Sequence, residues 1–238
     1  MPIFSSTMSA GQWYSNDPNY DKVIFLLRGE YWQDDSIYRW PVNNVANGGT
    51  AAISAAQYKY GNSSMLFTGR GYGEVIGTRN NANISIGTGD YTVDFWLRVN
   101  TGGLTAGNFV VGQGDWGKTT GVNRWWMNYN NSPEWKILRE GNASAFPGSG
   151  VVTLNTNQWY HMAYVRSASS VKLYRDGTLL YTYAGTDATS YAYTGYPLTV
   201  GNDWKGTTYD CNHYLSHIRI TKMARYTANF TPPTAAQY

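Results

Sequence analysis

Apolar and polar residues alternate along several short segments of the chain. In residues 91–99, every second side chain from Tyr91 onward is apolar, and the positions between them carry Thr92, Asp94, Trp96 and Arg98. A repeat of two residues places successive side chains on opposite faces of a β-strand. The same repeat runs through residues 158–166, where one face carries Trp159, His161, Ala163 and Val165. Since both faces of these segments contain apolar residues, we expect two strands that are covered on both sides.

Similar short segments recur along the chain, separated by turns rich in Gly, Asn, Ser and Asp. The predicted strands are residues 23–27, 64–67, 91–99, 108–112, 124–129, 134–138, 158–166, 171–175, 179–183, 198–201 and 214–221. Asp176-Gly177 lies between two of them and accepts the positive φ angles of a tight hairpin. Residues 51–58 are the best helical candidate, and no apolar stripe at helical spacing extends over three turns. The pattern predicts an all-β fold, a two-sheet antiparallel β-sandwich.

The chain contains no evident second core, internal repeat or linker. Residues 1–17 are polar and small apart from isolated aromatics, so we expect a short N-terminal arm before one domain at residues 18–238. The N-terminus lacks the basic and apolar regions of a signal peptide. The longest apolar run, residues 23–27, is far shorter than the ~20 residues of a membrane span. We therefore expect synthesis in a cytoplasm and no membrane partner.

The charge distribution makes nucleic acid an unexpected partner. Charged residues form only 14% of the 238-residue chain, and the formal net charge is +3. The nearest approach to a basic cluster is Arg219, Lys222 and Arg225, which apolar and polar residues interrupt. Binding to phosphates requires a concentrated basic stripe. Aromatic residues, by contrast, form 16% of the chain and include 21 Tyr and 10 Trp.

The acidic residues do not form the carboxylate pair of a glycoside hydrolase. Such a pair lies about 5–9.5 Å apart, which on one strand requires acids two or four positions apart. Asp94 has Trp96 and Arg98 at those positions, so we expect a structural acid that is solvated or paired with Arg98. The adjacent Asp34 and Asp35 point apart, and Glu134 and Glu140 are six residues apart. We expect no catalytic residue and no enzymatic activity.

The remaining reactive residue types favour structural roles. Cys211 is the only cysteine, which excludes an intrachain disulfide, and it is expected to pack as a small apolar group. His161 and His217 lie within strand patterns and are expected to be packed or hydrogen-bonded. Three His and one Cys provide no zinc spacing. The glycine cluster at residues 69–73 lacks the Lys-Ser/Thr of a phosphate loop and is interpreted as a turn.

The order of the strand segments resembles a known family. The similarity is carried by residues 23–27, 64–69, 89–96, 158–166 and 171–177, and most specifically by the ending Arg219-Ile220-Thr221, Arg225-Tyr226 and Phe230-Thr231-Pro232-Pro233. This series resembles the laminin-G-like branch of the concanavalin A-like lectin/glucanase jelly rolls, of the type found in bacteriophage virion proteins. The resemblance extends from about Asp17 to Pro233. It implies two curved, stacked sheets with a role in recognition or display, although a fold alone supplies no ligand.

The resemblance also raises calcium as a cofactor, since some laminin-G-like relatives bind it. The position after the strand ending at Phe67 holds Thr68, and Ser216-His217 replaces the usual acidic pair before Ile218. Glu30 alone matches an acidic position, whereas Ca²⁺ takes 6–8 oxygen ligands. Calcium is therefore conceivable but unsupported, and we expect no cofactor and no metal site.

Aromatic residues in loops are the candidate ligand contacts. Trp and Tyr combine a large apolar ring with a polar tip, which suits the flat faces of sugars. Trp96 and Trp159 are expected in the core, and of Trp125 and Trp126 one faces in and one faces out. The candidate glycan-binding residues are Asp115, Trp116, Trp126, Asn128, Asn202, Asp203 and Trp204.

Two functions remain open for such a domain on a virion surface. In the first, it binds host-surface glycan as an adhesin or receptor-binding (tail fibre) module. In the second, it is a capsid decoration or cement subunit whose arm and aromatic patches make protein contacts without sugar. The expected partners are other virion proteins, host-cell polysaccharide in the first case, and further copies of the chain in a homo-oligomer. The absence of a coiled coil or long shaft favours a compact accessory subunit.

Overall fold

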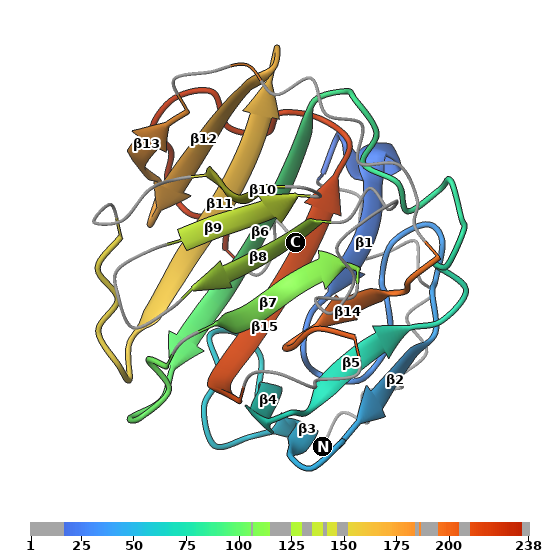
Figure 1. Cartoon of the computed structure of the whole chain (residues 1–238), viewed down its shortest axis with the longest axis vertical. Coiled ribbons are helices and arrows are strands. Elements are labelled where there is room, and N and C mark those ends of the chain that lie inside the picture. The colour runs from blue at the N-terminus through green and yellow to red at the C-terminus, as the bar shows by residue number, and fades with distance from the viewer. Residues whose placement is uncertain are drawn as a thin grey trace, which may run out of the picture.

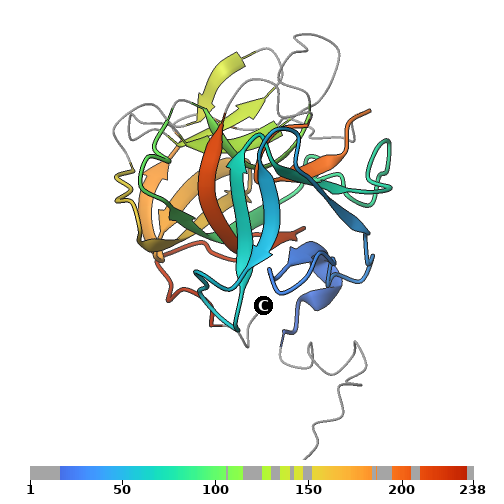
Figure 2. The same cartoon turned by 90° about the horizontal axis from the view of Figure 1, so that it is seen from below.

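Two antiparallel β-sheets stack face to face, as Figures 1 and 2 show for this computed structural model. The structure describes residues 17–105, 107–114, 125–129, 135–139, 142–146, 152–183, 186, 195–204 and 210–234. A short 3-10 helix, η2 (Tyr20–Lys22), precedes the first strand. No helix in these ranges has the length and apolar character needed to cross a bilayer. The all-β sandwich expected from the sequence is confirmed.

The larger sheet, called the large sheet below, has the strand order β13-β12-β11-β6-β15-β4-β3, and β1 also pairs with β15. Its strands are β1 (Val23–Leu27), β3 (Thr50–Ser54), β4 (Ser64–Gly69), β6 (Tyr91–Val99), β11 (Trp159–Ser167), β12 (Ser170–Arg175), β13 (Thr178–Thr182) and β15 (Cys211–Thr221). The central strand β15 pairs with β4 through its first half and with β1 through its second half. The change of partner coincides with a register shift between Ser216 and Arg219, where His217 has a positive φ of 52°.

The second sheet, called the small sheet, has the order β10-β9-β8-β7-β14-β5-β2. Its strands are β2 (Val42–Val45), β5 (Tyr72–Val75), β7 (Asn108–Gln113), β8 (Trp125–Tyr129), β9 (Trp135–Arg139), β10 (Asn142–Phe146) and β14 (Leu198–Val200). The strand pairs of both sheets are antiparallel throughout the described ranges. In Figure 1 this sheet lies in front of the large one.

The strand predictions succeed where the alternation is long. β1 and β6 have the predicted bounds, and the hairpin at Asp176-Gly177 is confirmed by the pairing of β12 with β13, with φ angles of 50° and 79° at the two turn residues. The sequence reading missed β2, β3, β5 and β10. The best helical candidate, residues 51–58, is not helical at its start, because residues 50–54 form a strand that pairs with β4.

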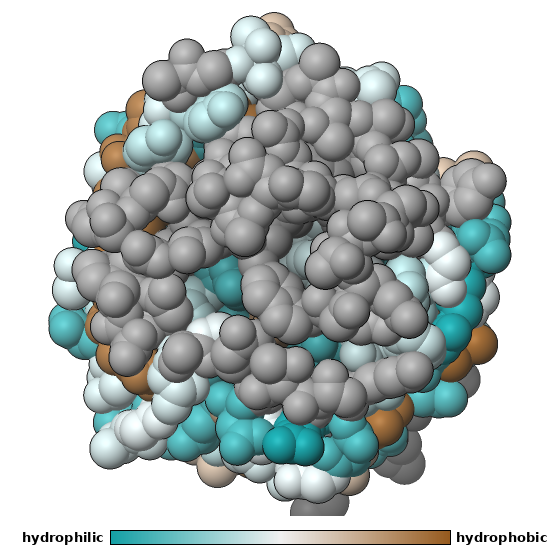
Figure 3. All heavy atoms as spheres, viewed as in Figure 1, coloured by the Kyte–Doolittle hydropathy of each residue, from teal (hydrophilic) through white to brown (hydrophobic). Residues whose placement is uncertain are grey.

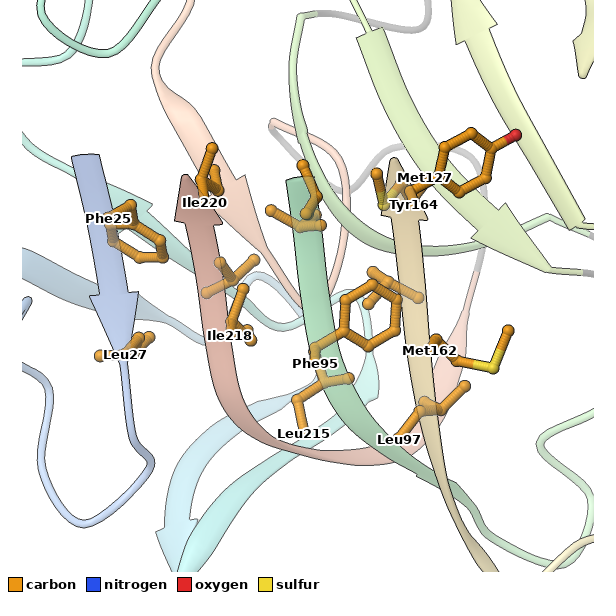
Figure 4. Packing of buried hydrophobic residues seen from close by; sticks show 14 of the residues in the cluster. Phe25, Leu27, Phe95, Leu97, Met127, Met162, Tyr164, Leu215, Ile218 and Ile220 are labelled. Atoms are coloured by element: carbon orange, nitrogen blue, oxygen red, sulfur yellow. The ribbon is translucent and has the colours of Figure 1, made fainter. Parts of the chain in front are cut away.

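The core lies between the inward faces of the two sheets. Figure 4 shows one layer of it on β1, β15, β6 and β11, with Phe95 and Leu97 beside Met162 and Tyr164 and with Met127 of the small sheet opposite. The predicted faces of residues 91–99 and 158–166 are confirmed by the register, which pairs Phe95 with Met162 and Val93 with Tyr164. On β8, Trp125 and Met127 face the core while Trp126 faces away, as the alternation requires.

The outer face of the large sheet is the face turned away from the small sheet, and residues 222–234 cover part of it. Figure 2 shows this red C-terminal segment on the far side of the large sheet. Arg225 Nη1 donates to both oxygens of Asp94, at 2.9 and 2.8 Å, and the rings of Tyr226 and Phe230 stack with centroids 3.6 Å apart. His161 Nε2 lies 3.4 Å from the same carboxylate. These contacts bury Asp94 completely.

Backbone contacts hold the same segment on the sheet. The Phe230 N–H donates to the Gly177 carbonyl at 2.9 Å, and the Leu179 N–H donates to Asn229 Oδ1 at 2.9 Å. A Cβ on Gly177 would lie 1.7 Å from the Phe230 carbonyl oxygen, so the close approach requires glycine. The Tyr60 hydroxyl donates to the Pro233 carbonyl at 2.9 Å. The distinctive C-terminal sequence therefore fastens the chain end across the large sheet.

The prediction for Asp94 was wrong about its surroundings. The carboxylate is neither solvated nor paired with Arg98, since it lies beneath Arg225 and beside His161 and the Tyr226 hydroxyl. Although burial alone acts to raise it, the pKa of Asp94 lies below its ordinary value because Arg225 and His161 stabilise the ionised form. Asp94 is thus a structural acid, as expected, but a buried one.

Candidate functional site

The candidate glycan-binding residues separate into groups with different surroundings. Asp115 and Trp116 lie outside the described residues. Asn202 and Asp203 form a buried turn directly after β14, with exposed fractions of 1% and 0%. The Asn202 amide donates to the Gly69 carbonyl at 3.3 Å, and Asn202 Oδ1 accepts from the Asp203 N–H at 2.8 Å. In this conformation neither side chain reaches the surface, and Asn202 fixes the turn against the end of β4.

Trp126 and Asn128 lie on the outer face of the small sheet, the face turned away from the large sheet. Both are buried, with exposed fractions of 2% and 7%. The Trp126 ring makes an edge-to-face contact with Phe109, with centroids 6.0 Å apart. A Cβ on the neighbouring Gly112 would lie 2.4 Å from Trp126 Cδ1, so the indole lies directly against the β7 backbone. Since only 2% of Trp126 is exposed, its ring offers almost no surface to a ligand in this conformation.

Trp204 is half-buried, whereas the other described candidates are buried. The Arg79 guanidinium lies 4.6 Å from the centre of its ring, and the Tyr196 ring centroid lies 5.2 Å away. Arg79 Nη2 also lies 2.7 Å from Glu74 Oε1. Glu74, Arg79, Tyr196 and Trp204 together are called the Trp204 cluster. It combines two aromatic rings, a cation and a carboxylate within one network, and the cation over its face fixes the orientation of the indole.

The register of the small sheet connects this cluster with Trp126. Glu74 pairs with Thr199 on β14, Thr199 pairs with Gly112 on β7, and Gly112 pairs with Trp126 on β8. Val75, Leu198 and Val111, their neighbours along the strands, belong to the core, so this row points outward. Three strand spacings separate its ends, roughly 14 Å. On the side of the molecule seen in Figure 3, the described surface is mainly polar, and apolar residues show in small groups near the rim.

The sequence reading did not find Glu74, Arg79 or Tyr196. They come from β5, the following loop and the segment before β14, so no spacing pattern connects them. A partial signal existed in the short segment Tyr72–Val75, where the polar Glu74 lies between Gly73 and Val75, which are both buried. Detecting the cluster required knowing that β5 and β14 are neighbours.

Two adjacent acids after β1 serve structural contacts. Asp34 is fully buried and accepts hydrogen bonds from the Leu26, Ser36 and Trp40 N–H groups. Burial raises its pKa, and these hydrogen bonds oppose the increase. The neighbouring Asp35 pairs with Arg28 at 3.1 Å and with Arg39 at 2.8 Å. Both carboxylates thereby hold the loop after β1.

The cysteine and the strand histidines are packed, as expected. Cys211 is buried with its Sγ 3.2 Å from the Gly69 carbonyl oxygen, and burial raises the pKa of its thiol to about 12. His217 Nδ1 lies 2.7 Å from the Ser216 hydroxyl. His213 lies in the core, with its Nδ1 3.0 Å from the Tyr129 hydroxyl. Within the described ranges, no three His, Cys, Asp or Glu side chains gather as metal ligands would.

The two tryptophans predicted in the core lie elsewhere. Trp96 and Trp159 point to the outer face of the large sheet, where Trp96 is 5% exposed and joins a small cluster with Val23 and Leu26. Trp159 is only half-buried at the margin of that cluster. The prediction was therefore wrong for Trp159, and Trp96 is buried outside the main core. The alternation along each strand shows which residues lie on the same face as each tryptophan, but it does not show which face points into the core.

The fold is shared with proteins of several kinds. Domain 4 of an extracellular arabinanase from Geobacillus stearothermophilus, solved with arabinotriose, superposes with a TM-score of 0.56 at 16% identity, over 91% of this chain and 97% of that one. The binding domain of Paraclostridial Mosquitocidal Protein 1 gives 0.58 at 15% identity, over 87% and 50%. Trypanosoma rangeli sialidase gives 0.56 at 14% identity, over 87% and 31%. The chain thus spans half or less of the latter two. No curated protein sequence matches it significantly.

A family model covers most of the chain. It matches residues 67–228, from within β4 through the strands of both sheets to the C-terminal segment that covers Asp94. These residues include the two long central strands β6 and β15 and the hairpin of β12 and β13. The chain therefore belongs to the Laminin_G_3 family of the concanavalin A-like lectin/glucanases superfamily.

Proposed function

We propose that this protein is a non-enzymatic, lectin-like module on the surface of a bacteriophage virion, where it binds host-surface glycan as an adhesin or receptor-binding module. The observation that carries the saccharide part is the Trp204 cluster. A half-exposed indole, oriented by Arg79 and flanked by Glu74, offers the apolar platform and the polar partners that sugars require. The virion location rests on the sequence resemblance of the C-terminal segment.

The comparisons support saccharide recognition by analogy. One structural neighbour is an arabinanase domain in complex with arabinotriose, and this chain covers 97% of it. Another is the receptor-binding domain of a botulinum neurotoxin mosaic, of which this chain covers 49%. At 14–16% identity these likenesses concern the fold. The ligand proposal therefore depends on the side chains of this chain.

A titration of the intact protein with host-surface polysaccharides tests the saccharide proposal. Trp204→Ala should weaken binding about 5- to 150-fold, since losing a stacked aromatic platform costs about 1–3 kcal/mol. Tyr58→Ala removes a half-exposed aromatic from the loop between β3 and β4, on the other sheet, and should leave affinity unchanged. Equal affinity of wild type and Trp204→Ala would remove the cluster from the site. Binding of no host polysaccharide would overturn the function itself.

The proposal that the protein is not an enzyme is supported by the ion pairs that its candidate catalytic acids form. Asp94 is held by Arg225, and Asp35 by Arg28 and Arg39, while Glu134 and Glu140 lie outside the described residues. Incubation with any polysaccharide that binds should release no new reducing ends. Their appearance at a rate proportional to protein concentration would contradict the proposal.

A capsid decoration role is the second candidate, and exposed apolar side chains favour it. Tyr31, Ile37 and Tyr58 are each 50% exposed, the first two on the loop between β1 and β2 and the third on the loop between β3 and β4. Such side chains suit protein contacts as well as ligands. Immunogold labelling of the particle separates the two: label at the tail supports the adhesin, and label over the capsid faces together with loss of incorporation when residues 1–16 are removed supports decoration.

A further inference from the structure

The C-terminal segment leaves one part of the outer face of the large sheet open. Its contacts on β6 end at Thr92 and Asp94, whereas Trp96 and Arg98 lie further along the same face of that strand. Arg98 pairs with Trp159 on β11 and with Tyr214 on β15, so the three side chains form one row. Arg98 and Trp159 are half-buried, in contrast to the fully buried Asp94, while Trp96 and Tyr214 beside them are buried, with exposed fractions of 5% and 7%. Lys59, Trp96, Arg98, Trp159 and Tyr214 are called the open half.

A second cation reaches this surface from the loop between β3 and β4. Lys59 Nζ lies 3.9 Å from the centre of the Trp96 ring and 5.6 Å from that of Tyr60. Partial burial lowers the pKa of Lys59, and the charge of Asp176 opposes the decrease. Trp96 and Arg98 are two residues apart on one strand, which places their Cα atoms roughly 6.6 Å from each other. Each cation thus lies against an aromatic ring of the outer face, Lys59 over Trp96 and Arg98 near Tyr214.

Neither cation forms an ion pair within the described ranges. Several carboxylates there pair with other cations: Asp94 with Arg225, Glu74 with Arg79 and Asp17 with Arg219. Arg98 instead lies 5.9 Å from the Tyr214 ring centre, and its Nη1 donates to Asn100 Oδ1 at 2.7 Å. A charge held by rings and an amide retains the capacity to pair with an incoming anion.

Amide side chains extend the polar part of the patch. Asn100 Nδ2 donates to Asn212 Oδ1 at 2.8 Å, and Asn212 Nδ2 donates to the Thr101 carbonyl at 3.3 Å. Both asparagines are half-buried beside the row of Arg98 and Tyr214. This chain of hydrogen bonds fixes the guanidinium before any ligand arrives, which reduces the entropy lost on binding.

We propose that the open half binds an acidic saccharide, whose ring packs against Trp159 while its carboxylate pairs with Arg98 and Lys59. Aromatic rings beside amide groups suit a sugar ring, and the two cations, which form no ion pair with a described residue, suit its charge. Two cations are too few for a nucleic acid, whose affinity depends on many phosphate contacts. This site lies on the opposite sheet from the Trp204 cluster and is independent of the function proposed for that cluster.

Oligogalacturonate and its methyl ester provide a matched pair of probes, because esterification removes the charge and keeps the sugar rings. The intact wild-type protein should bind the acid at least tenfold more tightly than the ester in calorimetric titration. Arg98→Gln should weaken binding of the acid about tenfold, and Lys59→Gln about threefold, since charge-assisted hydrogen bonds are the strong ones. Arg70→Gln, a matched control whose exposed guanidinium faces Asp210 outside both candidate sites, should leave this affinity unchanged, and thermal melts should confirm that each variant is folded.

Three results would overturn the proposal. The acid and its ester could bind equally, or Arg98→Gln could bind the acid as the wild type does. Alternatively, polyglutamate could bind as tightly as oligogalacturonate with the same dependence on Arg98, which would assign the surface to an acidic protein. A Trp204→Ala variant that loses host polysaccharide but keeps oligogalacturonate would support two separate sites. If Trp204→Ala lost binding of both host polysaccharide and oligogalacturonate, the two sites would not be independent.

Discussion

The outer face of the large sheet has a sealed half and an open half on the same strands. Asp94 and Arg98 occupy one face of β6, four residues apart. The carboxylate of Asp94 is covered by Arg225 and the stacked rings of Tyr226 and Phe230. The guanidinium of Arg98 is half-exposed and has rings and an amide for partners. Asp94 and Arg98 follow the same strand pattern, so the pattern does not distinguish them. They differ because residues 222–234 cover Asp94 and leave Arg98 half-buried.

The contacts that stabilise the fold and the side chains proposed to bind a ligand lie in different halves of this face. In the sealed half, backbone and side-chain contacts from residues 222–234 fix the β12–β13 hairpin and neutralise Asp94. In the open half, no comparable segment within the described ranges spans Arg98 and Trp159. Changes in the sealed half should therefore reduce stability, and changes in the open half should alter binding.

Acid is expected to have the largest effect on the buried interior. Burial lowers the pKa of both His213 and His217 to about 3, so the folded protein keeps them neutral while the unfolded chain protonates them below pH 6.5. Their contribution to stability is fully present above pH 6.5 and is lost as the pH falls toward 3. Two protons correspond to a slope of about 2.7 kcal/mol per pH unit within this window. Urea unfolding at a series of pH values measures it.

His213→Asn should reduce that slope by about half, because one proton then no longer binds on unfolding. Asp94 does not interfere between pH 6.5 and pH 4.5, since its lowered pKa keeps it ionised in the folded protein and its contribution is lost as the pH falls below about 3.8. A free energy of unfolding that stays constant between pH 6.5 and pH 4.5 would contradict the buried neutral state of both histidines.

Arg225→Gln should produce the largest effect of a single substitution in the sealed half. It leaves the fully buried Asp94 carboxylate without its bidentate partner, which costs about 3–5 kcal/mol of unfolding free energy. Chemical denaturation measures the loss. The double variant Asp94→Asn/Arg225→Gln should recover part of it, and a single variant as stable as the wild type would show that the segment does not neutralise the charge.

Gly177→Ala should have a smaller but distinctive effect. Its Cβ would lie 1.7 Å from the Phe230 carbonyl oxygen, so residues 222–234 must move away from the hairpin. Gly102→Ala is the matched control, because Gly102 has a similar φ of 76° and no atom within 4 Å of the added Cβ. The control should show the cost of a positive φ alone, about 1–2 kcal/mol. Faster proteolysis at residues 222–234 is expected for Gly177→Ala only, and equal behaviour of the two variants would exclude the contact.

Arg98→Gln should have the smallest effect on stability, within about 0.5 kcal/mol, because the side chain is half-exposed and has no carboxylate partner in the described ranges. Denaturation of Arg98→Gln beside Arg225→Gln compares the two halves directly. A loss as large as that of Arg225→Gln would make Arg98 a structural residue and remove the contrast.

The sequence predicts the strands better than it predicts what covers them. β1 and β6 follow from a repeat of two residues, and the β12–β13 turn follows from Asp176-Gly177. The same repeat placed Trp159 with His161 correctly but could not decide which face is inward, because both faces carry apolar residues. Arg225, the partner of Asp94, lies 131 residues away in sequence, so no local spacing connects them.

The candidate binding residues were harder to predict for the same reason. Trp204 was identified from its residue type, whereas Glu74 and Arg79 join it only because β5 and β14 are neighbours. Trp126 faces outward as the alternation requires, yet it is buried, and alternation says nothing about a second layer above a sheet. Strand β3, with two alanines and no clear alternation, resembled a helix until its pairing with β4 was known.

A titration followed through the tryptophan indole N–H signals in NMR tests the central claim most directly. Addition of oligogalacturonate to the intact protein should shift the signals of Trp159 and Trp96, while that of Trp125, which is buried in the core, stays in place. Addition of a host polysaccharide that binds should shift the signal of Trp204. A spectrum in which neither ligand moves Trp159 or Trp204 would show that the aromatic surfaces on the two sheets do not bind saccharides.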